Sequence, residues 1–374
     1  MSGRLVILAS GGTGGHMFPA EALASALLAR GHRVALVTDR RGQAFADRLP
    51  DVALHRIPAG RLDAGLVGKA MGVAEMILGT LIAGRLLGRL QPAVAVGFGG
   101  YPSVPTMLAA TRRRVATVLH EQNALMGRAN RLLAPRVTRI ATSFPHVQGL
   151  KAADVGRTGF TGNPVRPDIV KLRDLPYPSP SGTINVLVTG GSQGARILST
   201  VIPDALARLP NDLKARIVLM QQARPEDVER VRGTHRQSGI NAEVAPFFHD
   251  LPARLSRAHL VIARAGASTV SELCVAGRPA ILVPFAAAAD DHQSFNARAL
   301  GDAGAAWVMP ERDFTPDALA ARLATLLAAP KMLATAALAA RDLGMPDAAS
   351  RLADLVLACA NANTRANKSG ESAA

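Results

Sequence analysis

Short apolar runs alternate with longer stretches of helical periodicity in the first part of the chain. The run Leu5–Ala9 is followed by a helical pattern over about 18–30 and by a second apolar run, Arg33–Val37. This order predicts a strand, a helix and a second, parallel strand. The alternation continues, with strands expected over 93–96, 116–119 and 139–142 and helices over 69–90, 102–111 and 127–134.

The pattern breaks in the middle of the chain and then restarts. Five prolines between Asn163 and Gly182 exclude a long regular element there, so a linker is expected. After it, the run Ile184–Val188, a Gly-Gly turn and a helix to about residue 209 repeat the arrangement of the N-terminal part. Further strands are expected over 216–220, 242–247, 260–264 and 280–284, and Ala/Leu-rich helices over 316–360.

These patterns predict an α/β protein with two Rossmann-like, doubly wound parallel-sheet domains that face each other across a cleft. The expected parts are an N-terminal domain over 1–162, the linker over 163–182, a C-terminal domain over 183–360 and a flexible polar tail over 361–374. Ligands of doubly wound sheets bind at the carboxyl ends of the strands. Candidate chemistry is therefore expected in the turns that follow the strands.

Composition narrows the class of protein. Hydrophobic residues make up 48% of the 374 residues, which excludes a disordered chain. Forty-three basic against 28 acidic residues give a net charge of +15, which favours a phosphate-bearing partner: nucleic acid, nucleotide or anionic lipid. With 3% aromatic residues and no zinc or RNP motif, a nucleic-acid-binding protein is the weaker alternative. Two cysteines exclude a disulfide framework.

The helical stretch 69–90 combines apolar and basic positions. Its charge-free stretch, Met76–Gly84, is shorter than the ~20 residues that span a bilayer, so no membrane crossing is expected. With Lys69, Arg85 and Arg89, the helix can lie on an anionic membrane surface, and the run 112–114 adds three arginines. Packing against the sheet is the alternative.

In each half of the chain, a glycine-rich turn follows the first predicted strand. The two turns read Gly11-Gly-Thr-Gly-Gly-His16 and Gly190-Gly-Ser-Gln-Gly-Ala195. Helix N-termini carry partial positive charge, so each turn can hold a phosphate. Neither turn matches the dinucleotide fingerprint or a P-loop, although Asp39, after the second strand, keeps a dinucleotide enzyme as a minor alternative.

Two polar groups in the first half are candidates for catalysis. His16 begins a predicted helix, whose dipole disfavours the imidazolium and leaves a neutral ring that can accept a proton. Its alternative role is to cap the helix. The cluster His120–Asn123 follows a strand and is expected at the same sheet edge, either as part of the site or as a structural loop network.

The second half offers two further candidates. Arg264 leads into a helix that carries Glu272, whose carboxylate can accept from both hydroxyls of a ribose; a first-turn glutamate that complements the helix dipole is the alternative. Asp290-Asp291 invites a metal hypothesis, but two adjacent carboxylates supply too few ligands and are more typical of a helix N-terminus. No metal site and no cofactor are expected.

Taken together, the motifs resemble glycosyltransferase family 28, and within it the N-acetylglucosaminyltransferases of peptidoglycan synthesis. The resemblance covers nearly the whole chain. Its pieces are Gly11–His16, Gly99–Pro105, His120–Asn123, Gly127, Asn130, Gly162–Arg166, Gly190–Ala195, Arg264–Glu272, Asp291–Gln293 and Asn296-Ala297.

The resemblance implies the GT-B fold and an inverting transfer of GlcNAc from UDP-GlcNAc to lipid I, giving lipid II and UDP. It also implies a peripheral protein on the cytoplasmic face of the bacterial inner membrane. Its expected partners are then UDP-GlcNAc, lipid I, the anionic membrane surface and other proteins of cell-wall synthesis and division, with no nucleic acid.

Residue roles follow from the same resemblance. Gly191 and Ser192 are expected to meet the diphosphate, Glu272 the ribose, the backbone near Phe248 the uracil, and His292 and Gln293 the GlcNAc hydroxyls. His16 is the expected base, with Glu121 as competitor. The other expected contacts are Thr13, Gly14, Gly15, Tyr101, Asn123, Arg166, Arg264 and Ala267.

Two positions depart from the family pattern. Phe248 is bulky where an aliphatic residue is common, and 286–289 is a run of alanines where more contact chemistry is expected. A UDP-GlcNAc 2-epimerase on the same scaffold is an alternative, because it binds the same nucleotide without a lipid acceptor.

Overall fold

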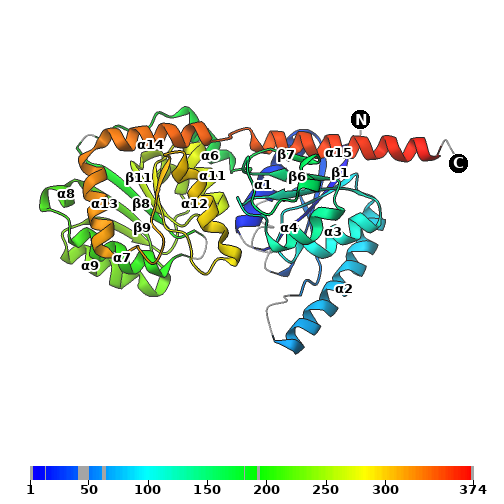
Figure 1. Cartoon of the computed structure of the whole chain (residues 1–374), viewed down its shortest axis with the longest axis horizontal. Coiled ribbons are helices and arrows are strands. Elements are labelled where there is room, and N and C mark those ends of the chain that lie inside the picture. Colours follow the sequence, from blue (N-terminus) through cyan, green and yellow to red (C-terminus); the bar gives the residue numbers. More distant parts are fainter. Residues whose placement is uncertain are drawn as a thin grey trace. The chain divides into compact units, whose positions relative to one another are not determined.

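The computed structural model describes residues 3–12, 14–40, 50–60, 65–180, 182–191 and 194–371. The chain forms two compact units (Figure 1): residues 1–166 together with 347–374, and residues 167–346. Each unit is built around its own parallel sheet.

The first unit contains a sheet of seven described strands in the order β3-β2-β1-β4-β5-β6-β7. All neighbouring strands are parallel. Its strands are β1 (Leu5–Ala9), β2 (Arg33–Thr38), β3 (Ala53–Arg56), β4 (Val94–Gly97), β5 (Ala116–Glu121), β6 (Arg139–Thr142) and β7 (Thr158–Phe160). Its helices are α1 (Gly14–Ala29), α2 (Leu66–Leu90), α3 (Ser103–Arg112), α4 (Arg128–Leu133), η2 (Ala134–Arg136), α5 (Ala152–Val155) and α15 (Ala348–Glu371).

Both faces of this sheet are covered, which explains why its strands read as unbroken apolar runs. Val6 and Leu8 pack in one buried cluster with residues of α1 and α15. Ile7 and Ala9 point to the other face and pack with residues of α2, α3 and α4. The period of two along β1 therefore separates two cores.

The second unit contains a sheet of six described strands in the order β10-β9-β8-β11-β12-β13, again all parallel. Its strands are β8 (Ile184–Thr189), β9 (Ile217–Gln222), β10 (Asn241–Ala245), β11 (Leu260–Ala263), β12 (Ala280–Leu282) and β13 (Ala306–Val308). Its helices are α6 (Pro167–Val170), η3 (Lys171–Asp174), α7 (Arg196–Ala207), α8 (Asn211–Arg216), η4 (Pro225–Asp227), α9 (Val228–Gln237), α10 (Leu251–Arg257), α11 (Ala267–Ala276), η5 (Ala289–Asp291), α12 (His292–Asp302), α13 (Pro316–Ala328) and α14 (Pro330–Leu343).

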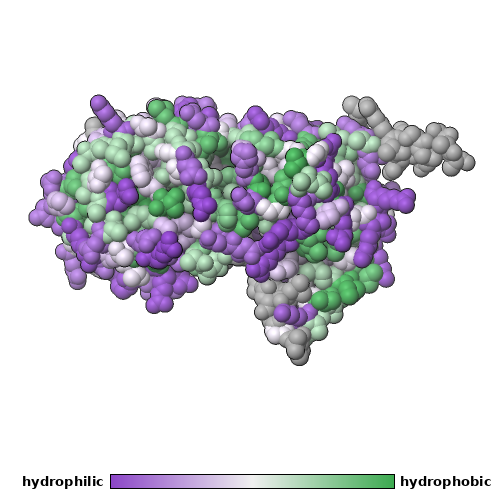
Figure 2. All heavy atoms as spheres, in the orientation of Figure 1, coloured by the Kyte–Doolittle hydropathy of each residue, from purple (hydrophilic) through white to green (hydrophobic). Residues whose placement is uncertain are grey.

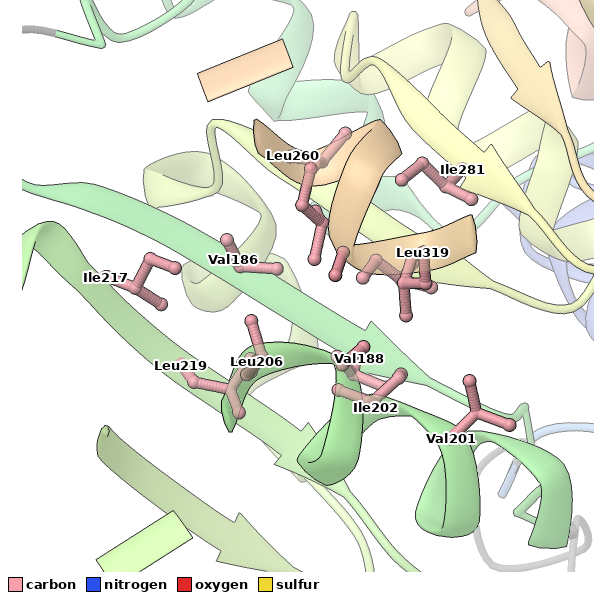
Figure 3. Close-up of a cluster of buried hydrophobic side chains, with 14 of the residues drawn as sticks. Val186, Val188, Val201, Ile202, Leu206, Ile217, Leu219, Leu260, Ile281 and Leu319 are labelled. Atoms are coloured by element: carbon pink, nitrogen blue, oxygen red, sulfur yellow. The ribbon is translucent and has the colours of Figure 1, made fainter. Parts of the chain in front are cut away.

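The core of the second unit lies between its sheet and two of its longer helices. Figure 3 shows Val186 and Val188 of β8 beside Ile202 and Leu206 of α7, with Leu319 of α13 in the same cluster. All five side chains are fully buried. At roughly 1.5–3 kcal/mol for each buried aliphatic side chain, this cluster is a main source of the unit's stability.

In each sheet the chain order reverses beside the first strand. β1 lies between β2 and β4, and β8 lies between β9 and β11. These are the switch points at which doubly wound sheets bind ligands, at the carboxyl ends of the strands. The two predicted doubly wound parallel-sheet domains are therefore confirmed, and both glycine-rich turns follow the strands at these switch points.

The C-terminal part of the predicted domain division was wrong. Helix α15 belongs to the first unit, not to the C-terminal domain, and it continues to Glu371 through the expected polar tail. Among its buried residues, Leu352, Val356 and Ala360 form one stripe that joins the core beside α1. The first boundary falls between Arg166 and Pro167, inside the predicted linker.

Helix α2 is longer and more apolar than the nine-residue stretch without charges, Met76–Gly84, led us to expect. By length and composition, Gly68–Leu90 qualifies to cross a membrane, with a mean hydropathy of 1.5, although no membrane is part of the structure. One face packs on the sheet through Ala83 and Leu87. The other leaves apolar side chains exposed, which are Met71, Val73, Ile77, Leu78 and Leu81.

Candidate functional site

The first switch point holds His16 in the first turn of α1. A Cβ added to Gly100 would lie 3.3 Å from the His16 ring, and one added to Gly99 would lie 3.5 Å from it. Gly99 has a φ angle of +83° and Gly100 one of +72°, a region that residues with a side chain rarely adopt. The loop after β4 thus needs glycine both for its conformation and to let the imidazole lie against it.

A buried polar network underlies this loop and connects three strand ends. His120 is fully buried, and its Nδ1 accepts from Gln122 Nε2 at 3.1 Å while its Nε2 donates to the Gly162 carbonyl at 3.2 Å. Gln122 also donates to the Phe98 carbonyl at 2.9 Å. Burial lowers the pKa of His120 to about 4, so its ring is neutral at pH 7.

Glu121 is enclosed rather than open to a substrate. Its side chain is 1% exposed, and its Oε1 accepts from Asn123 N at 3.0 Å and from Asn123 Nδ2 at 3.2 Å. Its Oε2 accepts from Gly127 N and Asn130 Nδ2, both at 2.8 Å. Burial raises its pKa, and these hydrogen bonds oppose the rise. The geometry suits a carboxylate that holds the loop from Asn123 to Gly127.

Other first-unit candidates lie around the start of α1. The Arg166 guanidinium lies 5.1 Å from the centre of the Phe18 ring, two residues after His16. Gly14 is buried and Gly15 is exposed, while Tyr101 is half-buried before α3. Thr13 lies outside the described residues. The structure thus gathers His16 and Arg166 near one helix end.

The second switch point holds the Gly190-Gly191 turn after β8. The Gly190 N–H donates to Gln222 Oε1 at 3.1 Å, and the Gly191 N–H donates to Thr189 Oγ1 at 3.3 Å. Both amides are thus engaged within the protein. The diphosphate contacts expected of Gly191 and Ser192 stay predictions, and Ser192 lies outside the described residues.

The expected uracil-binding segment is held by an arginine. The Arg254 guanidinium stacks 4.0 Å from the centre of the buried Phe248 ring. It also donates to Asp250 at 2.7 Å and to both oxygens of Glu243 at 2.6 and 2.8 Å. The unusual Phe248 therefore has a packing role, because Arg254 stacks on its ring.

Arg264 connects the ends of β11, β12 and β13. Its guanidinium pairs with Glu311 at 2.5 Å and donates to the carbonyls of Val283 at 3.2 Å and Pro284 at 3.3 Å. Ala263, which precedes it, is in register with Thr189 of β8. The backbone of Arg264 therefore follows the strand beside β8, while its guanidinium is held at the ends of β12 and β13. Its expected contact with the donor stays a prediction.

Gln293 and Asn296 attach α12 to the turn after β11. Gln293 Oε1 accepts from Ala265 N at 3.2 Å and from Phe285 N at 3.0 Å, and Asn296 Nδ2 donates to the Ala265 carbonyl at 3.0 Å. The carbonyl end of Gln293 is thus used internally. Its amide group is the part that remains to meet a sugar hydroxyl as a donor.

The remaining candidates of the second unit, Ala267, Glu272 and His292, lie on helices α11 and α12. Ala267 is the first residue of α11, and Glu272 is 7% exposed in the second turn. The alternative that Glu272 complements the helix dipole from the first turn is therefore wrong. His292 begins α12, directly after Asp290 and Asp291, which both have left-handed φ angles, 54° and 56°. Among the described residues, no group of three His, Cys, Asp or Glu is arranged to hold a metal.

Three residues of this site were missed at the sequence level: Gln222, Arg254 and Glu311. Gln222 had a signal, because it is a polar residue at the end of an apolar strand, like His120. Arg254 and Glu311 had none, because each acts through partners that only the folded chain brings near.

Comparison with known proteins decides the family. The model of the glycosyltransferase family 28 N-terminal domain matches residues 6–142, and that of the family's C-terminal domain matches residues 185–352. A relative from Rhodospirillum centenum is 57% identical over 96% of both chains. The chain belongs to glycosyltransferase family 28.

The relatives share one activity name. The family 28 proteins of Rhodospirillum centenum and of Paramagnetospirillum magneticum, the latter 54% identical over 94% of this chain and 96% of its own, are both named UDP-N-acetylglucosamine–N-acetylmuramyl-(pentapeptide) pyrophosphoryl-undecaprenol N-acetylglucosamine transferase. The crystal structure of Acinetobacter baumannii MurG has a TM-score of 0.77 at 29% identity and covers 95% of this chain and 99% of its own. The family resemblance drawn from the motifs is confirmed, and the chain is a glycosyltransferase.

Proposed function

We propose that this chain transfers GlcNAc from UDP-GlcNAc to the C4 hydroxyl of MurNAc in lipid I, with inversion at the anomeric carbon. The products are lipid II and UDP. The observation that carries the proposal is the near-complete match to a 57% identical relative that bears the name of this activity. It favours the transferase over the 2-epimerase and over a nucleic-acid-binding protein.

The chemistry assigned to the first unit is deprotonation of the acceptor. His16 takes the proton of the C4 hydroxyl, and the oxygen attacks C1 of the donor sugar as the bond from C1 to the UDP oxygen breaks. Glu121 is the poorer candidate for this base, because it is 1% exposed and four hydrogen bonds occupy its oxygens. We therefore assign it to holding Asn123.

The chemistry assigned to the second unit is donor binding and relief of charge on the departing UDP. The N-terminus of α7 and the residues before it supply partial positive charge. Arg264 follows β11, the strand beside β8, and we assign it to the donor site, where its guanidinium holds the ends of β12 and β13. The motif resemblance assigns Arg166 to the leaving group. Glu272 and the backbone near Phe248 are assigned to the ribose and the uracil.

We assign α2 to the membrane surface. The apolar side chains that it exposes, with Ile77 58% and Leu81 55% exposed, form the green patch over α2 in Figure 2. Exposed Arg85 and Arg89 lie on the same helix, and three arginines, Arg112 to Arg114, lie at the C-terminal end of α3, which packs against it. A helix with exposed apolar and basic side chains suits the surface of an anionic leaflet. It supports our proposal of a peripheral protein on the cytoplasmic face of the inner membrane. We propose proteins of cell-wall synthesis and division as its partners there.

The transfer of labelled GlcNAc from UDP-GlcNAc to a lipid I analogue tests the function. A β-linked disaccharide product and released UDP are expected, and label must stay on the nucleotide when the acceptor is omitted. Conversion of UDP-GlcNAc to its 2-epimer without acceptor would favour the rival enzyme and contradict the proposal.

A further inference from the structure

Gln222 lies between the two segments of the second unit assigned to the nucleotide. It is the last residue of β9, which has β8 on one side and β10 on the other. The Gly190-Gly191 turn follows β8, and Pro246, two residues before Phe248, follows β10. The side chain is 5% exposed.

Four hydrogen bonds use the whole side chain. Its Oε1 accepts from Thr189 Oγ1 at 3.0 Å and from the Gly190 N–H at 3.1 Å. Its Nε2 donates to the Gly191 carbonyl at 3.0 Å and to the Pro246 carbonyl at 3.2 Å. A glutamine amide offers two acceptor and two donor positions, so none is left for a ligand.

We infer that Gln222 is a positioning residue, which sets the distance between the diphosphate-binding turn and the uracil-binding segment and so matches the site to a nucleoside diphosphate. This inference rests on the proposed donor site of the second unit. Three of its bonds hold the turn and the fourth holds the segment that leads to Phe248. In the described part of the chain, no other side chain hydrogen-bonds to both. Pre-organised subsites bind a ligand that spans them without a cost of ordering at the moment of binding.

The preceding residue supplies a matched control. Gln221 is fully buried in the same strand and points to the opposite face of the sheet. Its Nε2 donates to the Leu198 carbonyl at 3.3 Å, and its Oε1 accepts from His235 Nε2 at 2.8 Å. Gln221→Met therefore removes buried hydrogen bonds from the same strand, one of them to the third residue of α7, without touching the Gly190-Gly191 turn or the segment that leads to Phe248.

The test compares Gln222→Met with Gln221→Met in the full-length chain, by calorimetric titration with UDP, by kcat and KM for UDP-GlcNAc, and by thermal unfolding. We expect Gln222→Met to weaken UDP binding and raise KM about tenfold at nearly unchanged kcat, the scale of one or two lost hydrogen bonds. Gln221→Met should lose similar stability with both values within about twofold of wild type.

A second variant keeps the inference testable if Gln222→Met does not fold. Gln222→Glu preserves the acceptor for Thr189 and Gly190, but its second oxygen meets the two carbonyls unless it is protonated. As the pH is lowered from about 8 to about 6, the introduced carboxylate becomes protonated. The UDP affinity of this variant should therefore rise relative to that of wild type over the same range. The inference would be overturned if Gln222→Met bound UDP as tightly as wild type, or if both methionine variants lost UDP affinity equally. It would also be overturned if the UDP affinity of Gln222→Glu showed the same dependence on pH as that of wild type. Failure of the wild-type chain to bind UDP would instead overturn the proposed donor site, and the inference with it.

Discussion

Asn130 donates its side-chain amide to Glu121 Oε2 at 2.8 Å, and neither residue is more than 2% exposed. The same amide donates to the His120 carbonyl at 3.2 Å. Asn130 also lies against the backbone of Gly99, since a Cβ there would be 3.3 Å from its Oδ1, and Gly99 borders the His16 ring. A buried carboxylate and the expected catalytic histidine are thus connected through one asparagine.

Loss of this asparagine should destabilise the first unit. Asn130→Ala leaves the Glu121 carboxylate with one donor fewer in a buried site, which predicts a loss of about 2 kcal/mol in the free energy of unfolding. Urea denaturation measures it. Asn130→Asp opposes two carboxylates and should cost more at pH 7 than at pH 5. An alanine variant as stable as wild type would show that Glu121 does not depend on this bond.

Removal of the His16 imidazole should affect turnover far more than donor binding. His16→Ala is expected to lower kcat by about 10²–10⁴-fold, the range for loss of a general base, with KM for UDP-GlcNAc within about threefold of wild type. Steady-state kinetics with a lipid I analogue measure both values. His146, which is exposed in the same unit, provides the control His146→Ala, expected to behave like wild type. Near-normal kcat in His16→Ala, or equal losses in both parameters, would refute the role.

Acidification should destabilise the fold through buried neutral histidines. Burial lowers the pKa values of both His120 and His235 from 6.5 to about 4. The unfolded chain then binds more protons between these limits, so the free energy of unfolding falls as pH decreases from 6.5 to 4, by about 3 kcal/mol at most for each ring. Urea denaturation at several pH values measures the slope. The glutamine side chain of His235→Gln cannot be protonated, so this variant should lose the part of the pH dependence that His235 causes. An unchanged slope in the variant would show that burial of His235 does not contribute to the pH dependence of stability.

Negative charge on the exposed face of α2 should weaken binding to anionic membranes. The double variant Ile77→Glu and Leu81→Glu is expected to lose at least about tenfold in partition to anionic vesicles, because it adds carboxylates where apolar side chains would enter the headgroup region. Liposome flotation measures the partition. Leu338→Glu is the control, because Leu338 is 63% exposed on α14 of the second unit. Equal binding of wild type to neutral and anionic vesicles, or equal loss in the control, would count against the assignment.

Periodicity was sufficient for the central strands and for the fold class. Leu5–Ala9 and Arg139–Thr142 were predicted to the residue, since each is a buried run with clear punctuation. The strands β3, β7 and β13 were not predicted. Each is short, β3 and β7 mix polar residues or glycine with apolar ones, and β13 has only three residues, so none forms a distinct apolar run. The helix α15 was assigned to the wrong unit for another reason: an apolar stripe shows that a helix is buried but not which sheet it covers.

The candidate site could be predicted only as far as its residues follow a strand directly. His16, Glu121 and Arg264 were found by that rule and by family motifs. Their hydrogen-bonding states were not, because Glu121 is enclosed by a loop that folds back onto it and Arg264 pairs with Glu311, 47 residues further along the chain. Which atoms of a polar side chain remain available for a substrate is decided by such contacts in space.

The placement of the donor in the second unit is tested most directly by a crystal structure of the chain with UDP. The diphosphate should lie beside the turn that begins at Gly190, with the uracil against the backbone near Phe248 and the ribose within reach of Glu272. UDP bound instead at the Gly11–His16 turn of the first unit would contradict the proposed division of donor and acceptor between the two units.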